Sequence, residues 1–165
     1  FGVRAAFRCG SRVKDVGHRT TSALGDRKKN VVYEIPCICG AIYIGQTEMA
    51  IKTRHKEHEA DLRLTRTDLE NGQEARAEQR MRTSKLVQHC VTDCGLNPDW
   101  KAVKILGTDQ GWMSRRLRES FFTKKKEYQG KRIINETDVM IDESWTQTLQ
   151  NVWSKEFWGR EVVVD

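Results

Sequence analysis

The stretch VVYEIPCICGAIYIGQT, residues 31–47, constrains the fold more than any other part of the chain. Residues 31–35 and 41–45 are short runs rich in β-branched and aromatic side chains, which is typical of strands. The five residues between them, 36–40, contain proline and glycine and are expected to form the turn. The stretch therefore predicts an antiparallel β-hairpin with two cysteines in its turn.

The predicted register of the hairpin places Tyr33 directly opposite Tyr43. Side chains alternate between the two faces of a strand, and opposed residues of an antiparallel pair share one face. Both phenols should thus stand on one face, while Val32, Ile42 and Ile44 point to a core on the other. Two tyrosines in this arrangement are either a pair that only packs or part of a site.

The rest of the chain predicts helices and a third strand around the hairpin. Glycine and capping residues mark the ends of these elements. The polar segment 65–84 breaks at Asn71-Gly72 and is expected to be a loop or an exposed helix. The remaining expected elements are a helix at 48–64 with Thr47 as N-cap, a helix at 84–94 followed by Gly95, a strand at 100–106 and a helix at 111–129.

These elements predict one small α/β domain of the α+β kind, with a three-stranded antiparallel sheet flanked by helices. Residues 1–30 are basic and poor in large apolar side chains, so they are interpreted as a linker or arm. Residues 31–140 form the predicted domain. Residues 141–165, which contain three tryptophans, are interpreted as a C-terminal extension that packs as a helix or an ordered arm.

The charge of the chain favours a polyanionic partner. The net charge is +6 and 32% of the residues are charged. Basic residues concentrate in the N-terminal arm, including Arg27, Lys28 and Lys29, and in the run Lys124, Lys125 and Lys126. Nucleic acid is the simplest partner for such a surface, although solubility alone also explains it. No apolar run approaches the length that spans a membrane.

The helix expected after the hairpin carries two residues that suggest chemistry. Arg54 and His58 are four residues apart and therefore share one helix face. Ile51, His55 and Leu62 border the same side. An arginine and a histidine on a half-apolar face are candidates for a site, and an ordinary polar pair at i,i+4 remains the alternative.

Taken in order, these motifs resemble the GIY-YIG nuclease superfamily. Val31-Val32-Tyr33 stands where Gly-Ile-Tyr is usual, and Tyr43-Ile44-Gly45 is intact. Glu119 in RRLRESFF matches the metal-binding glutamate, and Asn135 in IINETD matches a late asparagine. The strings around residues 31–138 look most like the endonuclease domain of Penelope-like retroelements, and their ordered combination is the specific signal.

The resemblance implies a role for each matching residue. Glu119 would bind a catalytic Mg²⁺ or Mn²⁺, and Arg54 would bind the phosphate. Tyr33 or Tyr43 would orient or deprotonate the attacking water. His58 would relay a proton or hold a phenol, and Asn135 would fix backbone or substrate, although a turn asparagine is nearly as good an explanation.

The cysteines predict a metal site. Cys9 stands alone, and the other four form the pairs Cys37/Cys39 and Cys90/Cys94, which bind metal more often than they form disulfides where nothing indicates secretion. The resembled domains carry two cysteines and two histidines here. His89 matches the first histidine, and Cys94 stands near the second, so the expected zinc ligands are Cys37, Cys39, His89 and Cys94. Cys90 is the alternate ligand, and buried free thiols are the alternative to zinc.

The resemblance as a whole implies a DNA endonuclease that nicks target DNA and so supplies a primer for reverse transcription. A nuclear protein, part of a larger polypeptide with a reverse transcriptase and in contact with element RNA, is the corresponding expectation, with no membrane partner. The alternatives are a repair or structure-selective nuclease of the same superfamily, and an inactive zinc module that only binds nucleic acid.

Overall fold

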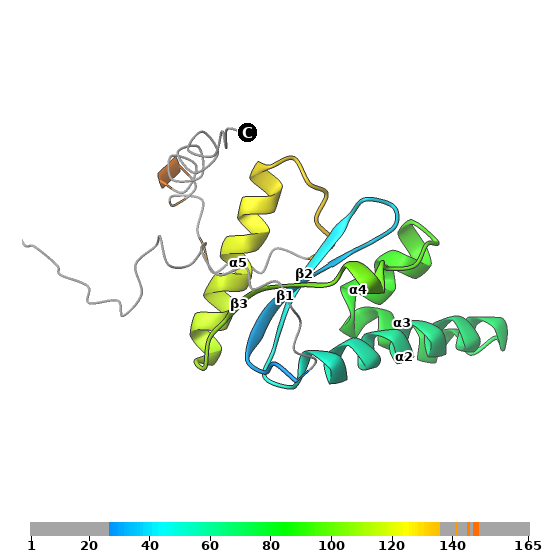
Figure 1. The fold of residues 1–165 in the computed structure, drawn as a ribbon. Helices are drawn as coiled ribbons and strands as arrows, with labels where there is room; N and C mark the ends of the chain where they lie inside the picture. Colours follow the sequence, from blue (N-terminus) through cyan, green and yellow to red (C-terminus); the bar gives the residue numbers. More distant parts are fainter. Residues whose placement is uncertain (1–26, 136–140, 142–144, 146, 149–165) are drawn as a thin grey trace, which may run out of the picture.

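The computed structural model describes residues 27–135, 141, 145, 147 and 148 of the chain, and the fold is α+β (Figure 1). Cys9, most of the predicted N-terminal arm and most of the C-terminal extension lie outside these residues. The elements are β1 (Val31–Pro36), β2 (Ile42–Thr47), α2 (Ile51–Glu70), α3 (Glu74–Thr83), α4 (Lys85–Gln88), a π-helical turn (His89–Asp93), a 3₁₀ turn (Trp100–Ala102), β3 (Lys104–Thr108) and α5 (Trp112–Tyr128).

The sheet has three antiparallel strands in the order β2-β1-β3, as predicted, with β1 in the centre. The predicted register of the hairpin is wrong by two residues. Tyr33 pairs with Gly45, and Tyr43 pairs with Ile35. The turn lies one residue later than expected, because Pro36 still belongs to β1 and the Cys37 N–H donates to the carbonyl of Ala41 at 2.7 Å.

The two-residue shift leaves both tyrosines on the same face, because side-chain direction repeats every two residues. Their ring centroids are 6.3 Å apart and the rings are tilted by 49°. The predicted division of the hairpin into two faces is thus confirmed. Tyr33 and Ile35 face one core, whereas Val32, Ile42 and Ile44 face the other.

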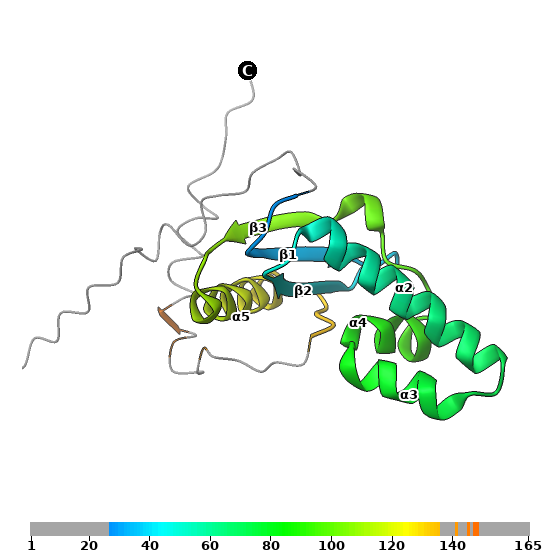
Figure 2. The ribbon, with the colours of Figure 1, turned by 90° about the horizontal axis from the view of Figure 1, so that it is seen from below.

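Helices cover both faces of the sheet (Figure 2). Helix α2 and the short helices that follow it pack on the tyrosine face, where Ile51, Leu62 and Leu86 enter the core. Helix α5 packs on the other face through Phe121 and Phe122. The molecule is therefore a sheet between two helical layers, and the side chains of β1 contribute to both.

Helix α2 differs from its prediction at both ends. Thr47 is the last residue of β2 and not the N-cap; its hydroxyl accepts a hydrogen bond from the Met49 N–H at 3.1 Å in the connecting turn. The helix begins at Ile51, whose N–H donates to the carbonyl of Lys28 at 2.9 Å. Lys28, which the sequence assigns to the arm, is therefore bonded to the domain.

Beyond residue 64, α2 continues to Glu70 and α3 packs back on it as a helical hairpin. The predicted break at Asn71-Gly72 is confirmed, with Gly72 at φ 69°. An ion pair between Asp68 and Arg80 and the fully buried Ala77 hold the two helices together. The polar segment is thus an exposed helical hairpin and not a loop.

The last two elements lie close to their predictions. The expected strand at 100–106 is a 3₁₀ turn at Trp100–Ala102, capped by the side chain of Asp99, followed by β3 at Lys104–Thr108. Helix α5 runs from Trp112 to Tyr128, one residue inside each predicted end.

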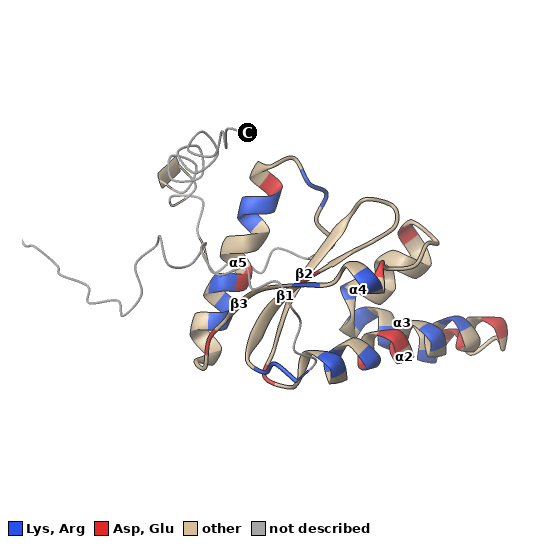
Figure 3. Ribbon diagram, in the orientation of Figure 1, with Lys and Arg blue, Asp and Glu red and all other residues tan. Residues whose placement is uncertain are grey.

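Acidic residues alternate with the basic residues on the helices (Figure 3). Lys126 forms a 2.7 Å ion pair with the buried Glu34, and Lys124 forms one of 3.1 Å with Glu127. The predicted lysine run is therefore partly engaged within the fold. Among the residues that the structure describes, no helix is long and apolar enough to cross a membrane.

Candidate active site and metal centre

The hydroxyl of Tyr33 is the centre of a polar network on the face of β1. It shares a hydrogen bond of 2.9 Å with Nε2 of His58 and accepts one of 3.4 Å from Nε of Arg54. Tyr33 and His58 are each only 1% exposed. The tyrosine, the arginine and the histidine singled out in the sequence are thus brought together by the packing of α2 on the sheet.

Gly45 makes room for the phenol pair. It lies opposite Tyr33 in the β1–β2 ladder. A Cβ atom at this position would stand 2.8 Å from the hydroxyl oxygen of Tyr33 and 2.8 Å from Cε1 of Tyr43. Both distances are shorter than side-chain contacts allow, so any other residue here displaces the tyrosines. The role of this glycine follows from the register, which the sequence reading misplaced.

Tyr43 completes the aromatic group and is the more accessible phenol. Its ring meets the ring of His58 edge-on, with centroids 5.5 Å apart. Tyr43 is half-buried, whereas Tyr33 is fully buried. A substrate or a water molecule therefore approaches Tyr43 more readily than Tyr33.

Glu119 lies on α5, which packs against the edge strand β2 from the other face of the sheet. It is half-buried, and its negative charge contributes to raising the pKa of both Tyr33 and Tyr43. Phe122, one turn after Glu119 on α5, is buried, whereas Trp112, two turns before it, is 50% exposed, so this face of the helix turns outward at its start.

The network holds its groups uncharged except for the arginine. Burial raises the pKa of Tyr33 far above its usual value, and the neighbouring Tyr43 adds to this effect. Burial, together with the charge of Arg54, lowers the pKa of His58 to about 3. Burial alone would lower the pKa of Arg54, but the two tyrosines and Glu57 outweigh it and raise that pKa. At neutral pH the site therefore contains two phenols, a neutral imidazole and one guanidinium.

Asn135 contacts the backbone of β2. Its amide oxygen accepts a hydrogen bond from the Ile44 N–H at 2.8 Å, and its amide nitrogen donates to the Ile44 carbonyl. Just before it, Ile133 bridges to Ile42 in parallel. Of the two roles considered for Asn135, the structure therefore has the backbone one: its side chain extends the hydrogen bonding of the edge strand that carries Tyr43.

Four potential metal ligands meet at the tip of the hairpin. The ligand atoms of Cys37, Cys39, His89 and Cys94 all lie within 4.8 Å of one another. The sulfur atoms of Cys37 and Cys94 are 3.7 Å apart, and the Cys39 sulfur is 3.2 Å from Nε2 of His89. Tetrahedral zinc with bonds of about 2.3 Å to sulfur separates two thiolates by about 3.8 Å. The cluster can thus hold a metal such as zinc.

The π-helical turn explains why Cys94 joins the cluster and Cys90 does not. The N–H of Cys94 donates to the carbonyl of His89 at 3.0 Å, an i→i+5 bond. This wider turn brings residue 94 beneath residue 89. Cys90 is instead fully buried in the apolar core. Nothing in the residue pattern of 84–94 distinguishes a π-turn from the α-helix expected there.

Neighbouring groups prepare the cluster for a cation. Nδ1 of His89 lies 3.3 Å from a carboxylate oxygen of Asp93, a contact that orients metal-binding imidazoles. Burial would raise the pKa of Cys39, but hydrogen bonds from the Ala41 backbone, His89 and other neighbours outweigh it and lower that pKa to about 6. One of those neighbours is Arg132, whose guanidinium donates to the Cys39 sulfur at 2.9 Å.

Three further residues belong to these sites and were not singled out in the sequence. Glu57 pairs with Arg54 at 2.9 Å and is the charged partner of that guanidinium. Asp93 contacts His89, and its position four residues after that histidine in a predicted helix is a usable sequence signal. Arg132 comes from a distant segment, and no local pattern indicates its contact with Cys39.

Comparison with known proteins gives no further guidance, since no family model, curated protein or solved structure matches the chain.

Proposed function

We propose that this domain is a metal-dependent endonuclease of the GIY-YIG type that nicks DNA. The observation that carries the proposal is the network in which the Tyr33 hydroxyl contacts both His58 and Arg54. Motif residues from a hairpin and a helix, separated by 21 and 25 positions in the sequence, meet at one buried oxygen atom. A pair of tyrosines that only packs does not require an arginine and a histidine at the same point.

The charges of the network suit phosphodiester cleavage. The half-buried guanidinium of Arg54 is positioned to bind a phosphate and to stabilise the negative charge that develops during attack. Tyr43, the accessible phenol, meets the attacking water, and Tyr33 holds Arg54 and His58 in place. Because burial raises the pKa of both phenols, deprotonation of the water depends on positive charge arriving with the substrate complex.

Glu119 is the residue that would hold a catalytic divalent cation. A single carboxylate on a half-buried helix position, within electrostatic reach of both phenols, fits Mg²⁺, which keeps most of its water ligands. When bound, the ion would polarise the phosphate and stabilise the leaving oxygen. Arg54 then remains the group that orients the phosphate towards Tyr43.

Zinc in the four-ligand cluster would serve the fold. Cys37 and Cys39 belong to the tip of the hairpin, and His89 and Cys94 belong to the π-helical turn. A bound ion would tie these segments together and contribute folding free energy directly. The strand that carries Tyr33 ends at this tip and the strand that carries Tyr43 begins there, so the metal centre would also fix the spacing of the active site.

The biological role we infer is retroelement insertion. The order of the motifs resembles the endonuclease of Penelope-like elements, which implies a nuclear protein whose nick primes reverse transcription. The polymerase would be another part of the same polypeptide. A repair or structure-selective nuclease would share the chemistry but prefer branched DNA over plain duplexes, so comparing the two substrates separates these roles.

The test is nicking of supercoiled plasmid with Mg²⁺. We expect Glu119→Gln to abolish nicking while DNA affinity is retained, because only the cation ligand is lost. Arg54→Ala should reduce the rate by on the order of 10², as loss of a charge-stabilising donor does. The matched control is Glu127→Gln, a carboxylate on the same helix that pairs with Lys124 and lies away from the phenols.

Two results would contradict the proposal. If the parent protein binds plasmid but never nicks it with Mg²⁺ or Mn²⁺, the domain is a binding module and the nuclease assignment fails. If Glu119→Gln nicks like the parent, the cation is held elsewhere. Loss of activity in Glu127→Gln as well would show that the substitutions act through the helix and not through the cation.

A further inference from the structure

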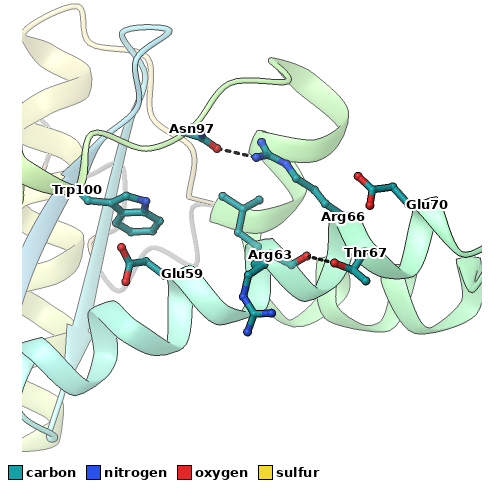
Figure 4. Close-up of a pocket in the computed structure, with 8 residues that line it drawn as sticks. Glu59, Arg63, Arg66, Thr67, Glu70, Asn97 and Trp100 are labelled. Carbon is teal, nitrogen blue, oxygen red and sulfur yellow. Dashed lines mark hydrogen bonds between the residues drawn. The ribbon is translucent and has the colours of Figure 1, made fainter.

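A pocket of about 380 Å³ lies along α2, beyond the candidate active site (Figure 4). Helix α2 lines one side of it through residues between Glu59 and Glu70, and the segment that carries Asn97 and Trp100 lines the other. Leu62 is the buried apolar residue among the lining side chains. None of the residues assigned to cleavage or to the metal centre lines this pocket.

An aromatic ring links the pocket to the active site. The indole of Trp100 lies against the imidazole of His55, with ring centroids 4.7 Å apart and the rings tilted by 38°. His55 follows Arg54 on α2, so this ring contact lies within one helical turn of the phosphate-binding residue. Arg63 lies nine residues after Arg54, which is about 14 Å further along the helix and about half a turn around it, since each residue adds 1.5 Å and about 100°. A strand that reaches both residues therefore passes around the side of α2 while it advances by about four nucleotide steps of 3.4 Å.

The charges of the pocket distinguish between its arginines. Arg66 is engaged: its guanidinium donates to Asn97 at 2.7 Å and to the carbonyl of Cys90 at 3.4 Å. Arg63 is exposed, and no side chain in the described part of the molecule pairs with its guanidinium. Figure 4 shows the two guanidinium groups pointing in different directions from α2. Arg63 is therefore the arginine that remains available to an incoming anion.

The carboxylates of the pocket select against an anion inside it. Glu59 and Glu70 repel a phosphate, but they accept hydrogen bonds from amino groups. A flat, neutral group that carries an amino function and stacks on an indole satisfies both the ring and the carboxylates. Adenine, cytosine and guanine have these properties, and thymine lacks the amino group.

We propose that this pocket receives an unpaired base of a DNA strand bound along α2, stacked on Trp100, while Arg63 binds an adjacent phosphate outside the pocket. The inference rests on the proposed function, because cleavage is what brings a DNA strand to Arg54. It adds a substrate feature to that function: the strand is unpaired within a few nucleotides of the cut. Bases that carry an amino group are preferred there over thymine.

The experiment measures binding of single-stranded decanucleotides by the full chain without added Mg²⁺, in a Glu119→Gln background. One 2-aminopurine is placed at successive positions, and its fluorescence reports stacking. We expect one position to be quenched in the parent and in Trp100→Phe, but not in Trp100→Ala. Loss of a base stack should weaken affinity roughly five- to a hundredfold. Replacing all cytosines by thymines should weaken it as well.

Arg63→Gln tests the phosphate contact at an exposed position that does not affect folding. It should lower the salt slope by about 0.7, the value for one contact to a single strand. The matched controls are Arg76→Gln on α3 and Trp112→Ala on α5, which are exposed and lie outside the pocket. Both controls should bind like the parent.

The inference fails if Trp100→Ala and Arg63→Gln bind the decanucleotides and quench 2-aminopurine like the parent. It also fails if the two control variants lose as much affinity as Trp100→Ala and Arg63→Gln. Preferential binding of a basic peptide over the decanucleotides would also overturn it, since the two carboxylates would then be the determinants. Plasmid nicking, measured separately without the Glu119 substitution, decides the proposed function. If the protein nicks plasmid but Trp100→Ala binds the decanucleotides like the parent, only the proposal for the pocket is refuted. If decanucleotide binding depends on Trp100 but the protein does not nick plasmid, only the nuclease proposal is refuted.

Discussion

Gly45 lies opposite Tyr33, where a Cβ atom would stand 2.8 Å from the Tyr33 hydroxyl oxygen and 2.8 Å from Cε1 of Tyr43. The positions of Tyr33 and Tyr43 thus depend on residue 45 of β2 having no Cβ atom. Gly107 in β3 is a natural comparison, because a Cβ atom there would have its nearest neighbours at 3.8 Å, an ordinary contact. The two glycines lie in the same sheet and differ in what surrounds them.

We therefore predict that Gly45→Ala lowers the rate of plasmid nicking by about 10², because a displacement of about 1 Å at a reacting group has that effect. Gly107→Ala should nick like the parent. Circular dichroism of both variants checks that the fold is retained. Equal activity of the two variants would show that the spacing of the phenols does not matter for cleavage.

His58 makes the fold sensitive to acid. Its pKa is lowered to about 3 in the folded protein by burial and by Arg54, whereas an unfolded histidine titrates near 6.5. The unfolded state therefore binds the proton first, and stability falls as the pH falls from 6.5 towards 3. We predict that this one residue costs about 2 kcal/mol of unfolding free energy at pH 5 relative to pH 7.

The measurement is urea unfolding of the parent and of His58→Gln at the two pH values. The substitution removes the titrating group and keeps a hydrogen-bonding partner for Tyr33, so the pH dependence of its stability should be smaller by about that amount. Acid release of zinc affects both proteins alike and cancels in the comparison. Parallel pH dependence of the two proteins would contradict the assigned titration.

At the scale of elements, the π-helical turn decides the composition of the metal centre. It brings Cys94 to His89 through an i→i+5 bond and leaves Cys90 in the apolar core. An uninterrupted α-helix would place Cys90 and Cys94 on one face, the alternative that their spacing indicated. A hydrogen bond that spans one residue more than in an α-helix thus places Cys94, and not Cys90, in the metal centre.

We predict about one zinc ion per chain in protein purified without added metal, the stoichiometry of one four-ligand site. Cys94→Ser should lose most of this zinc and melt at a lower temperature, because the metal contributes folding free energy. Cys90→Ala should keep its zinc, although the cavity lowers its stability. Elemental analysis decides the question, and zinc loss in Cys90→Ala but not in Cys94→Ser would reverse the assignment.

At the scale of the whole molecule, the net charge of +6 includes lysines that form ion pairs within the described residues. In α5, Lys124 and Lys126 pair with Glu127 and Glu34. Residues 1–26 contain a series of basic residues in the sequence, including Arg4, Arg8 and Arg12. The terminal segment is therefore the better candidate for contacts with DNA phosphates.

We predict that duplex affinity falls with salt with a log–log slope of a few units, at about −0.9 per phosphate contact. Removal of residues 1–26 should make this slope shallower, whereas Lys124→Gln should leave it nearly unchanged. The deletion ends before Lys28, whose carbonyl bonds to the start of α2. A salt titration in the Glu119→Gln background measures both, and a slope of zero in the parent would refute phosphate-driven binding.

The sequence by itself determined the hairpin, the approximate positions of the third strand and the last helix, and the division of the sheet into two faces. Alternation keeps Tyr33 and Tyr43 on one side of the hairpin both in the predicted register and in the observed one, which differs by two residues, and spacing by four places Arg54 and His58 on one helix face. The same local rules ended the helices near Asn71-Gly72, Gly95 and Gly130. These features depend on neighbours within a turn or two of the chain, so they can be read from short stretches.

Only the tertiary structure decided which atoms meet. The register of the hairpin, and with it the role of Gly45, depends on a turn whose length the residues 36–41 do not specify uniquely. The exclusion of Cys90 from the cluster depends on a π-turn, and the bonding of Asn135 to Ile44 joins residues 91 positions apart. Such contacts are selected by packing the whole domain at once, because their partners come from segments that the chain brings together only when it folds.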